Sequence, residues 1–95
     1  MYMRTTRFQL KQASIAKFEE VTDEARKTTA NFDGLQHSYA AIDDAGNGLV
    51  VAVWDSEEKA TANLAAVKEA WAGLAEHFDG PPQMAGYTNA LRVKG

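Results

Sequence analysis

The chain has 95 residues, of which 45% are apolar and 24% are charged, and its formal net charge is −3 at pH 7. This length corresponds to one small domain, and the composition is that of a folded globular chain, which excludes intrinsic disorder. The 10 Lys and Arg residues are balanced by 13 Asp and Glu residues. Because both signs are scattered along the chain, the basic surface that nucleic-acid binding requires is missing, and we expect no nucleic-acid partner.

The chain contains no cysteine, which excludes a disulfide framework, a thiolate nucleophile, a cysteine-ligated zinc ion and an iron–sulfur cluster. Its first residues lead into an alternating pattern and not into an apolar signal segment. No stretch approaches the roughly 20 apolar residues of a membrane span. We therefore expect residues 1–95 to form a single cytoplasmic domain with no membrane partner.

The first third of the sequence predicts a strand followed by a helix. Over residues 2–10 the larger apolar side chains share one parity, which is the period of a strand. Apolar residues then recur at spacings of three and four over residues 14–31, and acids precede bases on the other side. These features predict an amphipathic helix that ends before Gly34, where the backbone can reverse.

The middle of the sequence predicts a hairpin. Residues 35–43 alternate, with Leu35, His37 and Tyr39 on one parity. An Asn-Gly pair then precedes residues 49–54, which are apolar on both parities. The second strand of the hairpin is therefore expected to be a central strand with both faces covered.

A second helical region and a last strand complete the chain. Asp55 or Ser56 is suited to cap the helix, and apolar residues keep helical spacing for some five turns after it. This predicts one long helix, or two with a break near Asn63, that stops at residues 79–82, which contain glycine and two prolines. Residues 83–93 then return to an extended pattern.

The predicted order of strand, helix, strand, strand, helix, strand is the ferredoxin-like βαββαβ arrangement of the α+β class. Right-handed crossovers place both helices on one face of a four-stranded antiparallel sheet. The doubly apolar residues 49–54 then leave an apolar surface on the opposite face. A chain of this size buries only about 60 to 65% of its unfolded surface, so a second copy covering that face is favoured, and we expect a homodimer.

Three segments carry a resemblance to a known family. They are Arg7-Phe8-Gln9-Leu10, Asn31-Phe32-Asp33-Gly34-Leu35 and Val51-Ala52-Val53-Trp54-Asp55-Ser56-Glu57-Glu58. Together with the element order they resemble the dimeric α/β-barrel superfamily and, within it, the antibiotic-biosynthesis-monooxygenase-like (ABM) proteins. The resemblance implies a homodimer whose two sheets form a barrel, with the fourth strand reaching toward the partner. It also implies a ligand cavity between sheet and helices.

The family's activities include cofactor-free oxidation of phenolic polyketides, haem degradation, peroxidase reactions and lactone isomerisation. The haem-degrading members resemble one another in an Asn on the first strand and a Trp and a His about ten residues apart on the second helix. Here Thr6 stands where the Asn would be, and Trp71 and His77 are six residues apart, which places them about 120° apart around a helix. Haem is therefore disfavoured, and we expect no cofactor.

A cofactor-free oxygenase needs an apolar pocket and a few donors that hold the substrate anion. His37 as base and Tyr39 as oxyanion donor are the catalytic candidates. The candidate substrate-binding residues are Trp54, Trp71, His77 and Arg92. Structural alternatives stay open: an exposed or dimer-facing position for His37 and Tyr39, a core position for Trp71, and an interaction of His77 with the helix dipole.

Other chemistries lack their sequence signals. The two histidines are 40 positions apart, without the spacing of metal ligands, so no metal site is expected. A nucleophile elbow is also missing. The leading hypothesis is a small-molecule-binding dimeric α/β-barrel protein acting as a cofactor-independent monooxygenase on an aromatic or quinone-like substrate. The alternatives are a non-catalytic binding or stress-related dimeric module and a subunit that assembles with another protein.

Overall fold

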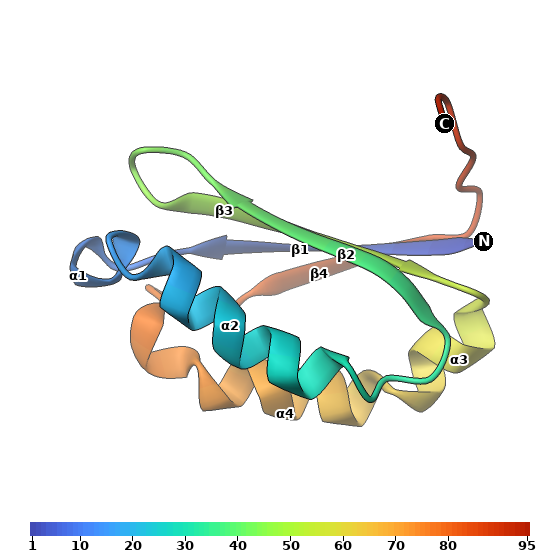
Figure 1. The fold of residues 1–95 in the computed structure, drawn as a ribbon, viewed down its shortest axis with the longest axis horizontal. Helices are drawn as coiled ribbons and strands as arrows, with labels where there is room; N and C mark the ends of the chain where they lie inside the picture. Colours follow the sequence, from blue (N-terminus) through green and yellow to red (C-terminus); the bar gives the residue numbers. More distant parts are fainter.

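Four strands form one sheet, and the helices lie on one side of it (Figure 1). The computed structural model describes all residues, 1–95. The elements in chain order are β1 (Tyr2–Gln9), α1 (Gln12–Ile15), α2 (Phe18–Thr29), β2 (Leu35–Ile42), β3 (Asn47–Trp54), α3 (Glu57–Ala62), α4 (Leu64–Gly73), the 3₁₀ helix η1 (Ala75–His77) and β4 (Gln83–Tyr87). The strand order is β2-β3-β1-β4, with every neighbouring pair antiparallel. The predicted ferredoxin-like α+β fold is confirmed.

The pairing of β1 with β3 defines the two faces of the sheet. Arg4 lies opposite Ala52, and Thr6 lies opposite Val50. These residues face α2 and α4, and the residues of the other parity, such as Met3 and Val51, form the face that no helix covers. We call this second surface the open face; its residues on β1, β2, β3 and β4 are Met3, Thr5, Arg7, His37, Tyr39, Ala41, Leu49, Val51, Val53, Gln83, Ala85 and Tyr87.

The first predicted helix is divided in two. Residues 12–15 form the short α1, and α2 begins at Phe18 after Ala16 and Lys17 leave the helix. The single helix predicted over residues 14–31 was therefore wrong in its continuity. Ser14 of α1 hydrogen-bonds to His77 at one end of the molecule, whereas α2 runs along the face of the sheet. The chain therefore changes direction between α1 and α2.

The second helical region breaks at Asn63, which is the second of the two alternatives that the sequence left open. The Asn63 side-chain nitrogen Nδ2 donates to the backbone oxygens of Lys59 at 2.8 Å and Asp33 at 3.0 Å, so it ties the helix break to the loop before β2. Helix α4 ends at Gly73, five residues before Phe78, and η1 follows it. The chain is thus less regular after Gly73 than the apolar spacing predicted.

Strand β4 ends at Tyr87 instead of residue 93. Its last residue pairs with Met3, close to the beginning of β1 at Tyr2. In this register Thr88 and Asn89 would lie opposite Tyr2 and Met1, so residues 90–95 have no β1 backbone left to pair with. They rise from the end of β4 on the side of the sheet away from α2 and α4 (Figure 1).

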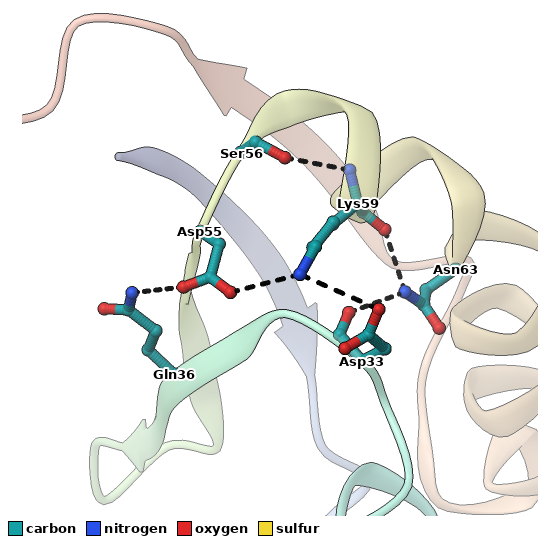
Figure 2. Close-up of polar contacts among 6 residues, drawn as sticks. All are labelled: Asp33, Gln36, Asp55, Ser56, Lys59 and Asn63. Carbon is teal, nitrogen blue, oxygen red and sulfur yellow. Dashed lines mark hydrogen bonds and ion pairs between the residues drawn. The ribbon is translucent and has the colours of Figure 1, made fainter.

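Polar contacts at the end of β3 hold the strand-to-helix junction (Figure 2). Ser56 is the N-cap of α3, and its hydroxyl oxygen accepts from the Lys59 backbone N–H at 3.2 Å. The Asp55 carboxylate accepts from the Gln36 side chain and lies 3.6 Å from Lys59 Nζ, which is also 3.8 Å from an Asp33 oxygen. Most of the signature that carried the family resemblance thus has a structural role.

The buried core is small and lies at the two ends of the helix-covered face. At one end Tyr2, Trp54 and Ala60 form a cluster against which Phe32 and Val67 pack. The other end holds the buried side chains of Leu10 and Phe78. The space between these two groups is not filled by side chains, and this space is the candidate site. None of the helices is long and apolar enough to cross a lipid bilayer.

Candidate functional site

A cavity of about 560 Å³ lies between the sheet and helices α2 and α4. Its floor is the helix-facing parity of β1, β2 and β3, and its roof consists mainly of residues from α2 and α4. A volume of roughly 300 to 1,000 Å³ with predominantly apolar walls is typical of small-molecule sites. The space between sheet and helices is therefore of the size and apolar character that favour a ligand site, although one side of it is open to solvent.

Aromatic rings form two walls of the cavity. Phe8, Trp71 and Phe78 pack together at one end, with ring centroids separated by 5.3 to 5.6 Å. Phe32 and Trp54 stack at the other end, with centroids 6.3 Å apart and planes inclined by 21°. A planar aromatic ligand can contact such walls by stacking or edge-to-face packing.

Few polar groups reach this apolar space. Arg4 and Thr6 from β1 and Ser38 from β2 line the floor, and Glu19 and Arg26 lie at the border formed by α2. Arg4 is only 9% exposed and Thr6 only 3% exposed. A small number of polar groups in a mainly apolar cavity is suited to orienting a ligand rather than to hydrating it.

Two buried donors in this region have no partner. The Arg4 Nη1 and Trp54 Nε1 atoms are both buried and make no hydrogen bond. The Arg4 guanidinium lies 5.6 Å from the centroid of the Tyr2 ring, a contact with the ring face that leaves the N–H groups free. Buried donors without acceptors are rare and costly, so these two atoms call for an explanation.

The two tryptophans predicted to bind substrate both line the cavity. Trp54, on β3, is 2% exposed and belongs to the buried cluster with Tyr2 and Ala60. Trp71, on α4, is partly buried in the aromatic wall with Phe8. The structure therefore brings these two predicted residues to one site, from different elements.

The two predicted catalytic residues lie on the open face. His37 pairs with Val53, and Tyr39 pairs with Val51, on the parity opposite to the cavity floor. Their rings stack on one another with centroids 6.5 Å apart. Tyr39 touches the edge of the cavity, but it is 69% exposed. This geometry does not support a joint base and donor role inside the cavity and agrees with the alternative of an exposed or dimer-facing position.

The remaining two predicted residues lie outside the cavity. His77 Nδ1 is 2.9 Å from the Ser14 hydroxyl, and His77 Nε2 is 3.7 Å from a Glu76 oxygen. His77 therefore ties α1 to η1. Arg92 lies in the exposed segment after β4. Neither His77 nor Arg92 lines the cavity together with Trp54 and Trp71.

The sequence interpretation missed Arg4 as a site residue. It stands on the apolar parity of the first strand, between Tyr2 and Thr6, where an uncompensated charge is unusual. That position was the available signal. Phe8, Phe32 and Phe78 were missed as cavity walls because aromatic residues at strand or helix spacing most often fill a core.

The chain presents no group of three or more His, Cys, Asp or Glu side chains placed to hold a metal ion. The cavity walls also offer no imidazole, because His77 bonds to Ser14 and His37 lies on the other face of the sheet. The chemistry of the cavity therefore rests on aromatic rings, hydroxyl groups, the guanidinium groups of Arg4 and Arg26 and the carboxylate of Glu19.

Comparisons with known proteins agree with this fold. A sequence model described as antibiotic biosynthesis monooxygenase matches residues 1–70. A protein of unknown function from Nitrosomonas europaea, NE2512, is 15% identical, with a TM-score of 0.77 over 99% of this chain and 94% of that one. A mutant of SnoaB, a cofactor-independent oxygenase from Streptomyces nogalater, is 16% identical, with a TM-score of 0.77 over 99% and 97%.

A conserved protein from Methanosarcina mazei is similar as well, with 15% identity and a TM-score of 0.76 over 95% of this chain and 94% of that one. No curated protein matches the sequence. At such identities the solved structures establish the fold alone, whereas the family model covers most of the chain. The chain therefore belongs to the antibiotic biosynthesis monooxygenase family.

Proposed function

We propose that the protein is a homodimeric, cofactor-independent monooxygenase that binds an aromatic or quinone-like substrate in the cavity between sheet and helices. The observation that carries the proposal is the cavity itself, whose volume is about 560 Å³ and whose two aromatic walls fit a planar polycyclic molecule. The family and the description of SnoaB as a cofactor-independent oxygenase support the reaction class.

Cofactor-free oxygenation places few demands on the protein. A phenol that tautomerises to a ring CH₂ group loses a proton from that carbon, and the resulting anion supplies the electrons that reduce O₂. One oxygen atom becomes the new carbonyl of the quinone, and the other leaves as water with the two hydrogens of the CH₂ group. The protein has to exclude water, hold the ring and stabilise the anion.

The residues of the cavity supply the last two of these functions. Trp54 and Trp71 hold the two ends of the ring system by aromatic contact. The unpaired Nε1–H group of Trp54 is placed to donate a hydrogen bond to an anionic oxygen of the ring system. In a mainly apolar space this stabilisation is stronger than in water.

The homodimer is supported by the open face and by the exposed area of the chain. One chain exposes 6456 Å², whereas a compact monomer of 10.4 kDa exposes about 5,400 Å². The excess is comparable with the roughly 800 Å² that each partner buries in a standard interface. Tyr39, Leu49 and Tyr87 are large exposed apolar residues on this face, and Leu91 and Val93 in the terminal segment are 86% and 100% exposed.

The test uses dithranol, a tricyclic phenol of the required type, and measures O₂ uptake with an oxygen electrode and ¹⁸O incorporation into the quinone by mass spectrometry. We expect protein-dependent uptake with one labelled oxygen in the product. The variant Ala52→Phe places a ring on the cavity floor and should abolish turnover. Ala66→Phe adds the same ring to an exposed position on α4 and should leave turnover unchanged.

Binding without oxidation would identify the alternative, a non-catalytic binding module. In that case dithranol changes the fluorescence of the wild-type protein but is not consumed faster than in buffer. Both tryptophans of the chain line the cavity, so their fluorescence reports occupancy directly. If Ala52→Phe and Ala66→Phe turn over dithranol equally, the cavity is not the reaction site.

A further inference from the structure

One charged residue in the lining of the cavity, Arg4, has no partner and gives information about the ligand that the apolar walls do not give. Arg4 is more than nine-tenths buried, at 9% exposure, and it lines the cavity from the central strand β1. No side-chain hydrogen bond or ion pair involves it, and its Nη1 atom is buried without any acceptor. An unpaired charge that is taken out of water in such a place destabilises the fold, so a structural role alone does not explain it.

Neighbouring residues hold Arg4 in place without neutralising it. The Tyr2 ring lies beneath the guanidinium group at 5.6 Å. That ring in turn lies over Gly86 of β4. Because Gly86 has no side chain, it leaves room for the Tyr2 hydroxyl, with which a side chain at this position would collide. Gly86 pairs with Arg4 across the two strands. The aromatic face positions the guanidinium plane and leaves its N–H edge for another acceptor.

The nearby groups also fail to provide a counter-ion. Glu19 is the carboxylate that borders the cavity, but it forms no ion pair with Arg4 within 4.0 Å. A second copy bound on the open face lies on the other side of the sheet and cannot pair with Arg4 through it. The missing anion is therefore expected inside the cavity.

A second orphan donor lies close to Arg4. Trp54 follows Ala52, the direct partner of Arg4, by two residues on the same face of β3. Such diagonal positions are roughly 7 to 8 Å apart, within reach of long side chains. Trp54 Nε1 has no acceptor either. Both free donors therefore come from neighbouring positions at the same end of the cavity.

Resting on the proposal that the cavity holds an aromatic ligand, we infer that the ligand carries a carboxylate and that Arg4 binds this group. A carboxylate matches the planar fork of the guanidinium group, which donates two parallel N–H bonds to its two oxygens. The aromatic part of the ligand extends from there between the walls of Phe32 with Trp54 and of Phe8 with Trp71. The preferred substrate is thus an aromatic molecule that carries a carboxylate, and dithranol represents only its ring system in the O₂-uptake test.

The probes are 2-naphthoate and 2-naphthamide, which share size and shape but differ in charge at neutral pH. Binding is measured by isothermal titration calorimetry on the purified full chain. A charge-assisted hydrogen bond predicts that the wild-type protein binds the naphthoate at least about tenfold more tightly than the amide. In Arg4→Met, which keeps an apolar stem of similar length, this ratio should fall to about one.

Arg7→Met is the matched control. Arg7 lies on the same strand, but it is exposed and belongs to the open face, so its loss should leave the ratio unchanged. Equal affinity of the wild-type protein for both probes, or an undiminished ratio in Arg4→Met, overturns the inference. The wild-type comparison can still overturn the inference if Arg4→Met does not fold. O₂ uptake is a separate measurement, so failure of the oxygenase proposal is distinguishable from loss of acid selectivity.

Discussion

The open face of the sheet gives the sharpest prediction about assembly, and Val51→Lys tests it. Val51 lies on the third strand between Thr5 on one side and Tyr39 on the other. In a twofold pair the same patch of each copy contributes, so a single substitution places two lysines in the interface. The isolated chain is little affected, because the side chain points from an uncovered sheet face into solvent.

The size of the effect follows from burial of the new charge. An unpaired ion costs several kcal/mol when it is taken out of water, and relaxation at the interface removes part of that cost. Two lysines losing about 2 kcal/mol each weaken the dimer by about 4 kcal/mol, which raises the dimer dissociation constant roughly a thousandfold. Ala66→Lys, on the exposed side of α4, is the control and introduces the same charge without this cost.

Sedimentation equilibrium across a dilution series from micromolar to submicromolar concentrations measures the dissociation constants. Circular dichroism establishes that each variant is folded. The dimer proposal is refuted by a wild-type chain that remains monomeric at micromolar concentration. The assignment of the interface to the open face is refuted if Val51→Lys and Ala66→Lys dimerise with the same constant.

Two further predictions concern stability and are measured by urea unfolding. Gly34→Ala should lower the free energy of unfolding by at least about 1 kcal/mol, because Gly34 has a φ of 87°, which a residue with a side chain adopts only at a cost. The added methyl group would also collide with Lys59. Gly73→Ala, where an added methyl group meets nothing within 4 Å, should be neutral or stabilising, and equal losses would contradict this reasoning. The pKa of Asp43 is lowered chiefly by the hydrogen bond from the Asn47 side chain. Its stabilisation is therefore complete above the unfolded pKa near 3.8 and is lost as the pH falls below it; in Asp43→Asn this acid-induced loss should be smaller, and an unchanged pH dependence would refute the assignment.

The fold was predictable because hydrophobic spacing is a property of each element alone. Alternation identified the strands, helical spacing identified α2 and α4, and turn residues separated them. The same spacing could not show the interruption at Ala16 and Lys17, because Ile15 and Phe18 keep helical periodicity across it. Contacts with His77, far along the chain, decide the direction of α1.

The positions of the site residues were less predictable, and β2 shows the physical reason. Counting by twos put Leu35 and His37 on one face, but the strand has a register irregularity between them. One extra residue moves all following side chains to the other face of the sheet. Leu35 packs against the buried cluster, whereas His37 and Tyr39 lie on the open face.

Arg4 illustrates the opposite case, in which a local rule is broken in the sequence and the structure supplies the reason. Alternation placed this charge on the apolar parity, and the structure leaves it there without a counter-ion. Such exceptions are expected at functional sites, where binding compensates a cost that folding does not. An unpaired cation on an apolar parity is therefore more informative than a histidine whose face depends on a bulge.

The third strand contributes to both proposed activities, and its alternation keeps them separate. Val50, Ala52 and Trp54 line the cavity, whereas Val51 and Val53 lie on the open face. A ligand or a partner that binds the folded chain stabilises it, by about 2.7 kcal/mol for a ligand at a hundred times its dissociation constant. Neighbouring residues of this strand point to opposite faces. Substitutions at Val51 and Val53 should therefore change dimer association, and substitutions at Val50, Ala52 and Trp54 should change ligand binding. A marginal core between two such surfaces then depends on both for its stability.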